Sequence, residues 1–189
     1  MSQTLLVLIA VLVLVAIIII VLYNSLIGKK NQVDYAFGGM DTMLKKRYDL
    51  IPNLVSTVQQ YATHERELLE EITHLRTQAL QDNLSADDKV DLDNQMSGAL
   101  GKIMVAVESY PDLKANENFL QLQASLNEIE EQISASRRAY NAAITDYNNG
   151  IEMFPTNIIA GMMNLKRKKV FEIPETERQN VNVGELFQR

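Results

Sequence analysis

The side chains best suited to chemistry in this sequence are two histidines and the carboxylates beside them. Glu71-Ile72-Thr73-His74 has the Glu-x-x-His spacing of di-iron helical bundles, which need that motif on each of two helices. His64 cannot supply the second copy, because Tyr61 stands three residues before it. His64 also lacks a second histidine four residues on, as the helical zinc-protease motif requires. We therefore predict no metal site.

Nucleophilic catalysis is not indicated either. The chain has no cysteine, which excludes thiol catalysis, Cys-ligated zinc and disulfide scaffolds. No serine is framed by a nucleophile elbow or by a glycine-rich phosphate loop. Gly38-Gly39 lies inside a helical pattern and not in a loop that could cradle a phosphate. We predict no catalytic residue, no cofactor and a non-enzymatic protein.

Two charged residues occupy unusual positions. Arg47 and Glu65 fall on the apolar face along which the first body segment would pack, called the seam here. Charges in a seam cost stability unless they are paired, and their usual benefit is to fix register or partner choice. We expect at least one of them in a buried ion pair between helices. The alternative is that both side chains reach the bundle edge. Glu108 and Arg137-Arg138 are further charged candidates, which the sequence alone does not pair.

The N-terminal segment that precedes all of these candidate residues has the composition of a membrane helix. Residues 1–28 carry no charged side chain, and Leu5 to Leu22 is an unbroken apolar run. A bilayer core of about 30 Å needs about 20 helical residues. The alternative, a cleaved signal peptide, calls for a basic start, a shorter apolar stretch and a small-residue cleavage site, none of which this sequence shows. We predict an uncleaved transmembrane anchor over residues 1–28.

Charge indicates orientation and excludes one class of partner. Lys29 and Lys30 follow the apolar run, whereas the residues before it are neutral, so the positive-inside rule predicts a cytoplasmic body and a short outer N-terminus. The formal net charge is −6, from 18 Lys+Arg and 24 Asp+Glu. This acidic balance argues against nucleic acid as a partner.

Beyond the anchor, apolar residues alternate in steps of four and three, as packed or coiled-coil helices require. The first seam comprises Met40, Leu44, Arg47, Ile51, Leu54, Val58, Tyr61, Glu65, Leu68, Ile72, Leu75 and Ala79. Pro52 lies within this seam and the phase is kept across it, which predicts one bent helix and not two.

Turn signals separate the remaining helices. Ser85 is a good N-cap after the turn at residues 81–85, Pro111 ends the second helix, and either Asp112 or Asn116 can begin a third that closes at Pro155. Residues 156–164 could add a fourth element. We predict an all-α protein in which a single N-terminal transmembrane helix (1–28) precedes an antiparallel bundle of long helices (29–165), followed by a basic segment and an irregular C-terminal tail (166–189).

The basic run Lys166-Arg167-Lys168-Lys169 permits two interpretations. It could be a solvated surface. It could instead contact anionic lipid headgroups, with the preceding apolar residues 158–163 dipping into the interface. A second pattern is the repeat of Tyr140-Asn141 one heptad later as Tyr147-Asn148, which places two aromatic rings on the seam and two amides beside them.

Several motifs together resemble the bacterial LemA family. They are residues 45–55 (KKRYDLIPNLV), Tyr61-Ala62, His64-Glu65, residues 108–116 (ESYPDLKAN), residues 118–122 (NFLQL), the two Tyr-Asn pairs and Phe154-Pro155. The chain departs from the family pattern at Ala36-Phe37, where relatives often carry tryptophan after the alanine, and at Gly38-Gly39. The resemblance implies a single N-terminal transmembrane helix, a helical-bundle body and no catalytic residues to carry over.

From these features we predict a scaffolding or interaction protein of the bacterial inner membrane. Its partners would be the lipid bilayer and further copies of itself, since anchoring raises the effective concentration of copies. The alternative is an adaptor or regulator of another membrane protein, such as a protease or a signalling kinase.

Overall fold

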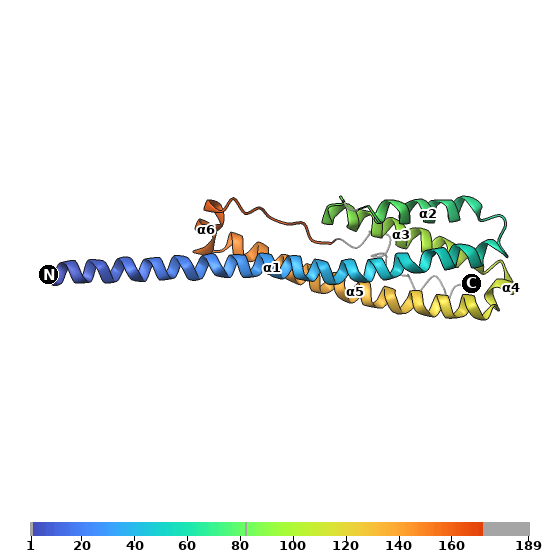
Figure 1. Cartoon of the computed structure of the whole chain (residues 1–189), viewed down its shortest axis with the longest axis horizontal. Coiled ribbons are helices and arrows are strands. Elements are labelled where there is room, and N and C mark those ends of the chain that lie inside the picture. The colour runs from blue at the N-terminus through green and yellow to red at the C-terminus, as the bar shows by residue number, and fades with distance from the viewer. Residues whose placement is uncertain (1, 82, 172–189) are drawn as a thin grey trace, which may run out of the picture.

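The chain is built from helices around one very long N-terminal rod (Figure 1). The computed structural model describes residues 2–81 and 83–171, and these contain no strand. The helices are α1 (Gln3–Gln59), α2 (Arg66–Ala79), α3 (Ala86–Val107), α4 (Pro111–Lys114), α5 (Glu117–Glu152) and α6 (Thr156–Met162). The predicted class, an apolar N-terminal helix followed by packed helices, is confirmed.

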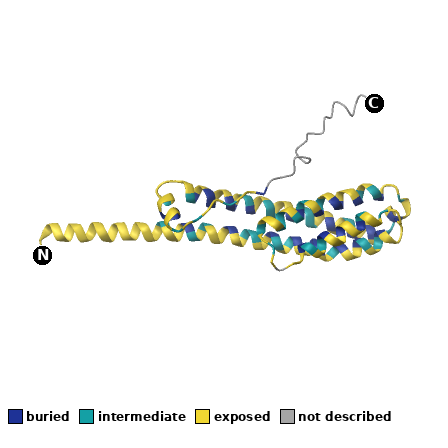
Figure 2. Ribbon diagram, turned by 90° about the horizontal axis from the view of Figure 1, so that it is seen from above, coloured by how far each residue is buried: buried dark blue, intermediate teal, exposed yellow. Residues whose placement is uncertain are grey.

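α1 joins the apolar run to the bundle without interruption. It has 57 residues, which corresponds to about 85 Å. Its first part stands alone and fully exposed, whereas its second part buries one side against the other helices (Figure 2). The helix continues through Pro52, as the unbroken phase of the seam predicted. Gly38 and Gly39 also lie within it and do not interrupt it.

The prediction that one helix spans the whole first seam is wrong. α1 ends at Gln59 and α2 begins at Arg66, so the seam is divided by a turn. Ala62 lies in that turn and is 2% exposed, because it packs into the core and closes the hairpin. Both helices face the same core, and the apolar spacing therefore stays in phase although the chain reverses direction.

Local signals set the other boundaries. The Ser85 hydroxyl accepts a hydrogen bond from the Asp88 amide at 3.1 Å, and the Asp88 carboxylate accepts one from the Ser85 amide at 3.2 Å. This reciprocal pair is a capping box at the start of α3, which confirms the predicted N-cap. The Asn116 side chain caps α5 by accepting from the Phe119 amide at 3.1 Å.

The core runs along the body part of α1. α5 lies beside α1 for its whole length, and the α2–α3 hairpin packs on the end of α1 farthest from the apolar run (Figure 1). After α6 the chain turns back along α5 as an extended segment and reaches Phe171, which is buried. Most of the predicted irregular tail, residues 172–189, lies outside the described residues.

Candidate membrane-interface site and buried ionic cluster

The first candidate site is the exposed apolar part of α1. Every described residue from Ser2 to Val21 is exposed, including Val7 at 63% and Leu12 at 61%. Among the described residues, α1 is the one helix long and apolar enough to cross a membrane. So much exposed apolar surface is unfavourable in water and favourable in hydrocarbon. The N-terminal helix therefore fits a membrane anchor.

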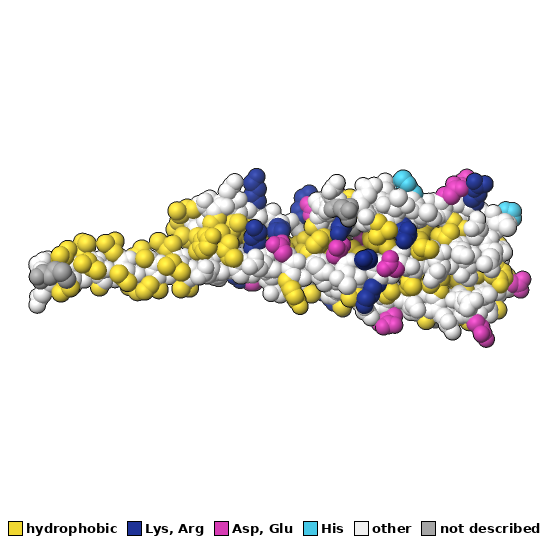
Figure 3. Space-filling model, viewed as in Figure 1, with side chains coloured by type: hydrophobic (Ala, Val, Ile, Leu, Met, Phe, Trp, Pro, Cys, Tyr) yellow, Lys and Arg dark blue, Asp and Glu magenta, His cyan; other side chains and the backbone are white. Residues whose placement is uncertain are grey.

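α6 extends this apolar surface sideways. Leu26 of α1 is 0% exposed because Ile159 and Ala160 of α6 cover it. The outer side of the α5–α6 corner is exposed and apolar, with Phe154 at 79% and Met162 at 82%. In Figure 3 hydrophobic side chains run without a gap from the N-terminal rod onto this corner. We call the exposed residues Met153, Phe154, Ile158 and Met162 the apolar corner.

Basic side chains lie beside the apolar corner. Lys29 follows the apolar run, and its Nζ lies 2.5 Å from an Asp146 carboxylate oxygen. The predicted lipid-contact residues Lys166, Arg167, Lys168 and Lys169 follow α6 directly. Of these four, Arg167 pairs with Glu152 at 2.8 Å and Lys168 lies 3.6 Å from Asp34, while Lys166 and Lys169 are exposed.

The second candidate site is a buried ionic cluster in which α1, α3 and α5 meet. Arg47 is 1% exposed, and its guanidinium forms an ion pair with Asp93, which is 0% exposed. It also donates to Glu130 at 2.8 Å and to the Ser97 hydroxyl at 2.9 Å. Arg137 forms an ion pair with the other oxygen of Asp93. Two arginines thus share one buried carboxylate, and Glu130 completes the balance of charge.

The cluster influences a neighbouring phenol. Burial raises the pKa of Tyr48 to about 12, and the negative charge of Asp93 adds to the shift, while Arg47 opposes it. The Arg47 guanidinium carbon also lies 5.8 Å from the centre of the Tyr48 ring. Ion pairs of this depth seldom add net stability over a well-packed apolar core, but they fix which helices can meet and in what register.

The structure does not bring the two predicted seam residues together. Glu65 is half-buried at the start of α2, where the Tyr110 hydroxyl donates to its carboxylate at 3.3 Å.

Sequence reasoning missed Asp93. The spacing holds a signal for it, because Asp93 lies three residues before buried Met96 and so on the same helix face, whereas Leu92 is only half-buried. Of the further candidates, Arg137 joins the cluster and Glu108 is exposed beside Lys114.

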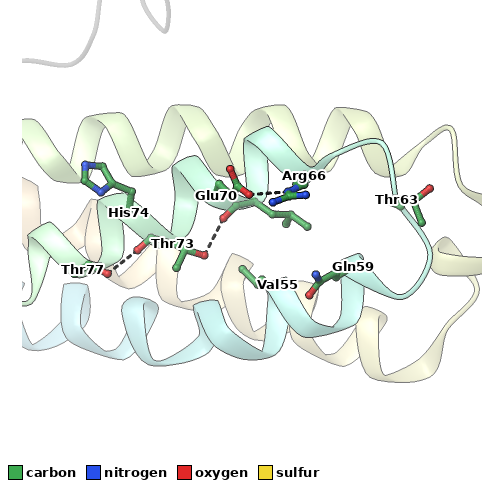
Figure 4. Close-up of a pocket in the computed structure, with 10 residues that line it drawn as sticks. Val55, Gln59, Thr63, Arg66, Glu70, Thr73, His74 and Thr77 are labelled. Atoms are coloured by element: carbon green, nitrogen blue, oxygen red, sulfur yellow. Dashed lines mark hydrogen bonds and ion pairs between the residues drawn. The ribbon is translucent and has the colours of Figure 1, made fainter.

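The Glu-x-x-His motif does not converge on a site. His74 lines a groove of about 710 Å³ between α1 and α2 (Figure 4). Glu71 lies instead 3.6 Å from Lys102 of α3. Within residues 2–81 and 83–171, no three His, Asp or Glu side chains are grouped to hold a metal ion. Two threonine hydroxyls in the groove donate to helix carbonyls, at 2.8 Å for Thr73 and 2.9 Å for Thr77, so neither is held by a base as a nucleophile would be.

Comparisons with known proteins agree with this architecture. A family model described as the LemA family matches residues 36–184. Protein LemA of Metamycoplasma hominis is 29% identical over 163 residues, which cover 86% of this chain and 74% of that protein. Magnetosome protein MamQ 2 of Paramagnetospirillum magneticum is 25% identical over 191 residues, which cover 88% of this chain and 70% of that protein. Magnetosome protein MamQ of Magnetospirillum gryphiswaldense is 22% identical over the same coverage. None of these names denotes an enzyme, and together with α1 they support a membrane-associated helical protein of non-enzymatic kind.

Proposed function

Because this chain belongs to the LemA family, we propose that it is a non-enzymatic scaffolding protein of the bacterial inner membrane that associates with further copies of itself. One observation carries the proposal. The apolar segment and the bundle share the single helix α1, so the bundle is joined to the bilayer by a continuous rod and not by a flexible linker.

The proposal divides the chain by environment. Residues 1–28 span the bilayer, residues 29–165 form the bundle beside it, and residues 166–189 form the basic segment and tail. Lys29 and Lys30 at the bundle end of the span support a cytoplasmic bundle, with the N-terminal end of the span outside.

The membrane interface is the second part of the proposal. The apolar corner lies just past the apolar run of α1, at the depth where aromatic and aliphatic side chains meet headgroups. Lys166 and Lys169 are exposed directly after it and have the charge that anionic headgroups attract. The bundle would then touch the bilayer at two places, through α1 and through α6.

Geometry and effective concentration support the proposed self-association. Parallel anchors hold every copy at the same height and confine the copies to two dimensions. Tyr35 of α1 is 79% exposed just beyond the proposed span, where a neighbouring copy held at the same height could reach it.

Cross-linking in intact cells tests this function. The chain has no cysteine, so a single introduced cysteine is its sole thiol. Tyr35→Cys places that thiol near the membrane, and Val105→Cys, at a site 74% exposed on α3, places it far away. We expect a bis-maleimide to give dimers with Tyr35→Cys. Monomers at both positions, together with a monomeric size in detergent, would contradict self-association. An impermeant maleimide that labels Tyr35→Cys only after cells are opened would support the cytoplasmic orientation.

A further inference from the structure

The extended segment after α6, residues 166–171, is attached to α5 by two asparagines. We call this segment the arm. The Asn148 side chain donates to the Lys168 carbonyl at 2.8 Å and accepts from the Lys168 amide at 3.0 Å. The Asn141 side chain does the same with Phe171, donating to its carbonyl at 3.0 Å and accepting from its amide at 2.7 Å. Each asparagine side chain thus hydrogen-bonds to both the amide and the carbonyl of a single arm residue, as the backbone of a paired strand residue does in a β-sheet.

The spacing of the two asparagines matches an extended peptide. Asn141 and Asn148 are one heptad apart, so they lie on one face of α5 and about 10.5 Å apart along its axis. Lys168 and Phe171 are three residues apart, which is about 10 Å in an extended chain. The repeat of Tyr-Asn at this interval is therefore suited to hold an extended backbone lying antiparallel to α5.

Specificity comes from the end of the arm. The asparagines contact only backbone atoms, so they accept many side chains at the positions they hold. Phe171, in contrast, is 6% exposed. Its ring lies edge-on to Tyr140 at 6.3 Å, and the Arg137 guanidinium carbon lies 4.8 Å from its centre. An aromatic side chain at this place is thus recognised on two sides.

The surroundings favour a basic peptide. Asp34 and Glu152 face the basic side chains of the arm. A groove of about 590 Å³ lies between the arm and α3, and Asp87 and Asp91 line it. In the described part of the chain, neither of these two aspartates forms an ion pair. The groove therefore leaves room and negative charge beside the arm for further basic side chains.

We propose that this face of α5 is a peptide-binding site, and that its ligand in trans is an extended basic segment of a partner protein with an aromatic residue at the place of Phe171. In the free protein the arm occupies the site and competes with that ligand. The inference rests on the proposed role as an interaction protein, but not on self-association.

A second copy of this chain is a poorer source of the ligand. The arm follows α6 directly, and α6 is fixed on its own α1 over Leu26. An arm could reach a neighbouring copy only if α6 left Leu26 and exposed it. A segment of a partner protein is not connected to α6 and can reach the site directly. Such a partner would be held at the membrane surface.

Peptide binding to the protein in lipid nanodiscs tests the site. The probe is a fluorescent peptide with the sequence of residues 165–171, and the receptor is a chain that ends at Leu165. We expect the shortened chain to bind the probe at least tenfold more tightly than the full chain, in which the arm competes. A probe N-methylated at the Lys168 and Phe171 positions keeps its charge and side chains but loses both donors, and it should bind at least tenfold more weakly.

The matched control is a probe N-methylated at the Lys169 and Val170 positions, whose amides have no partner among the described residues. It should bind as the unmodified probe does. Equal binding of all three probes would show charge attraction alone and overturn the proposal. Co-purification of the shortened chain with a full-length second chain carrying Asn141→Ala and Asn148→Ala, if lost when that second chain also ends at Leu165, would show that the occupant is the arm of another copy, and would overturn the assignment to a partner.

If the shortened chain loses its helical content, the proposal is tested instead by two measurements on the full chain. Phe171→Ala weakens the attachment of the arm to α5, and it should therefore raise the affinity of the full chain for the probe at least threefold. In amide exchange, Lys168 and Phe171 should be protected while Lys169 and Val170 exchange freely. The proposal would be overturned if Phe171→Ala did not raise the affinity for the probe. It would also be overturned if the amides of residues 168–171 all exchanged at the same rate. Failure of any of these experiments leaves the cross-linking test of self-association unaffected.

Discussion

Arg47 of α1 and Asp93 of α3, distant in sequence, form an ion pair in which both side chains are almost completely shielded from solvent. A charge of this kind must find its partner before the helices can close, because a wrong register leaves it unpaired in the core. The pair therefore selects one arrangement of α1, α3 and α5 among the many that apolar seams alone would accept.

The first prediction concerns Asp93. Asp93→Ala leaves two arginines without their shared carboxylate and should lower the free energy of unfolding by about 3–5 kcal/mol. Denaturant unfolding followed by circular dichroism measures this. Asp91→Ala, two residues away on the same helix but exposed, is the matched control and should change stability by less than about 0.5 kcal/mol. Similar losses for both variants would show that the cluster has no special role.

The second prediction concerns Tyr48 at high pH. Its pKa is raised to about 12, so the folded state keeps this phenol neutral while the unfolded state ionises near pH 10. The stabilisation is complete below about pH 10 and is lost as the pH rises through about 12. Burial also raises the pKa of Tyr110, Tyr140 and Tyr147, but only Tyr48 is shifted to about 12, so absorbance titration should show that the last phenolate to form disappears in Tyr48→Phe and in urea. A late step that persists in Tyr48→Phe would assign it to another residue.

The third prediction places the apolar corner in the membrane interface. The chain has no tryptophan, so Phe154→Trp introduces a single tryptophan whose emission can be excited selectively. Its emission should be blue-shifted in nanodiscs and quenched by lipids that carry a quencher near the headgroup. Leu120→Trp, at a site 48% exposed near the far end of α5, is the control and should stay unquenched. Equal quenching of the two variants, or of neither, contradicts the placement.

The fourth prediction concerns the basic residues beside α6. A chain that begins at Asn24 keeps Leu26 beneath α6 but loses the span. Lys166→Gln with Lys169→Gln should weaken its binding to anionic vesicles by about 2 kcal/mol, at about 1 kcal/mol for each charge. Lys102→Gln with Lys114→Gln removes the same charge far from the anchor and should have little effect. Sedimentation with vesicles measures both, and an equal loss would indicate net charge alone.

Features with a local cause could be predicted from the sequence. The apolar run, the cap at Ser85 and the cap at Asn116, one of the two helix starts considered there, each depend on a few adjacent residues. Continuation of α1 through Pro52 followed from the phase of the seam. These signals report directly on one helix, so no knowledge of its neighbours was needed.

The rest depended on distant contacts. No glycine or proline marks the turn after Gln59, and the hairpin closes because Ala62 fits the core. The spacing from Met96 could have placed Asp93 on the inner face of its helix, but not the two guanidiniums that α1 and α5 bring to it. The Tyr-Asn repeat was visible, but nothing in the sequence indicated that residues 166–171 return to it.

The unbroken course of α1 has a mechanical consequence. A spanning helix tilts when the thickness of the hydrocarbon layer changes. Because the same helix forms the spine of the bundle for about 55 Å beyond Leu22, a change of about 10° in tilt moves the turn between α1 and α2 sideways by about 10 Å (Figure 1). In the proposed arrangement, with the apolar part of α1 across the bilayer, the local thickness of that bilayer would set the lateral position of the far end of the bundle.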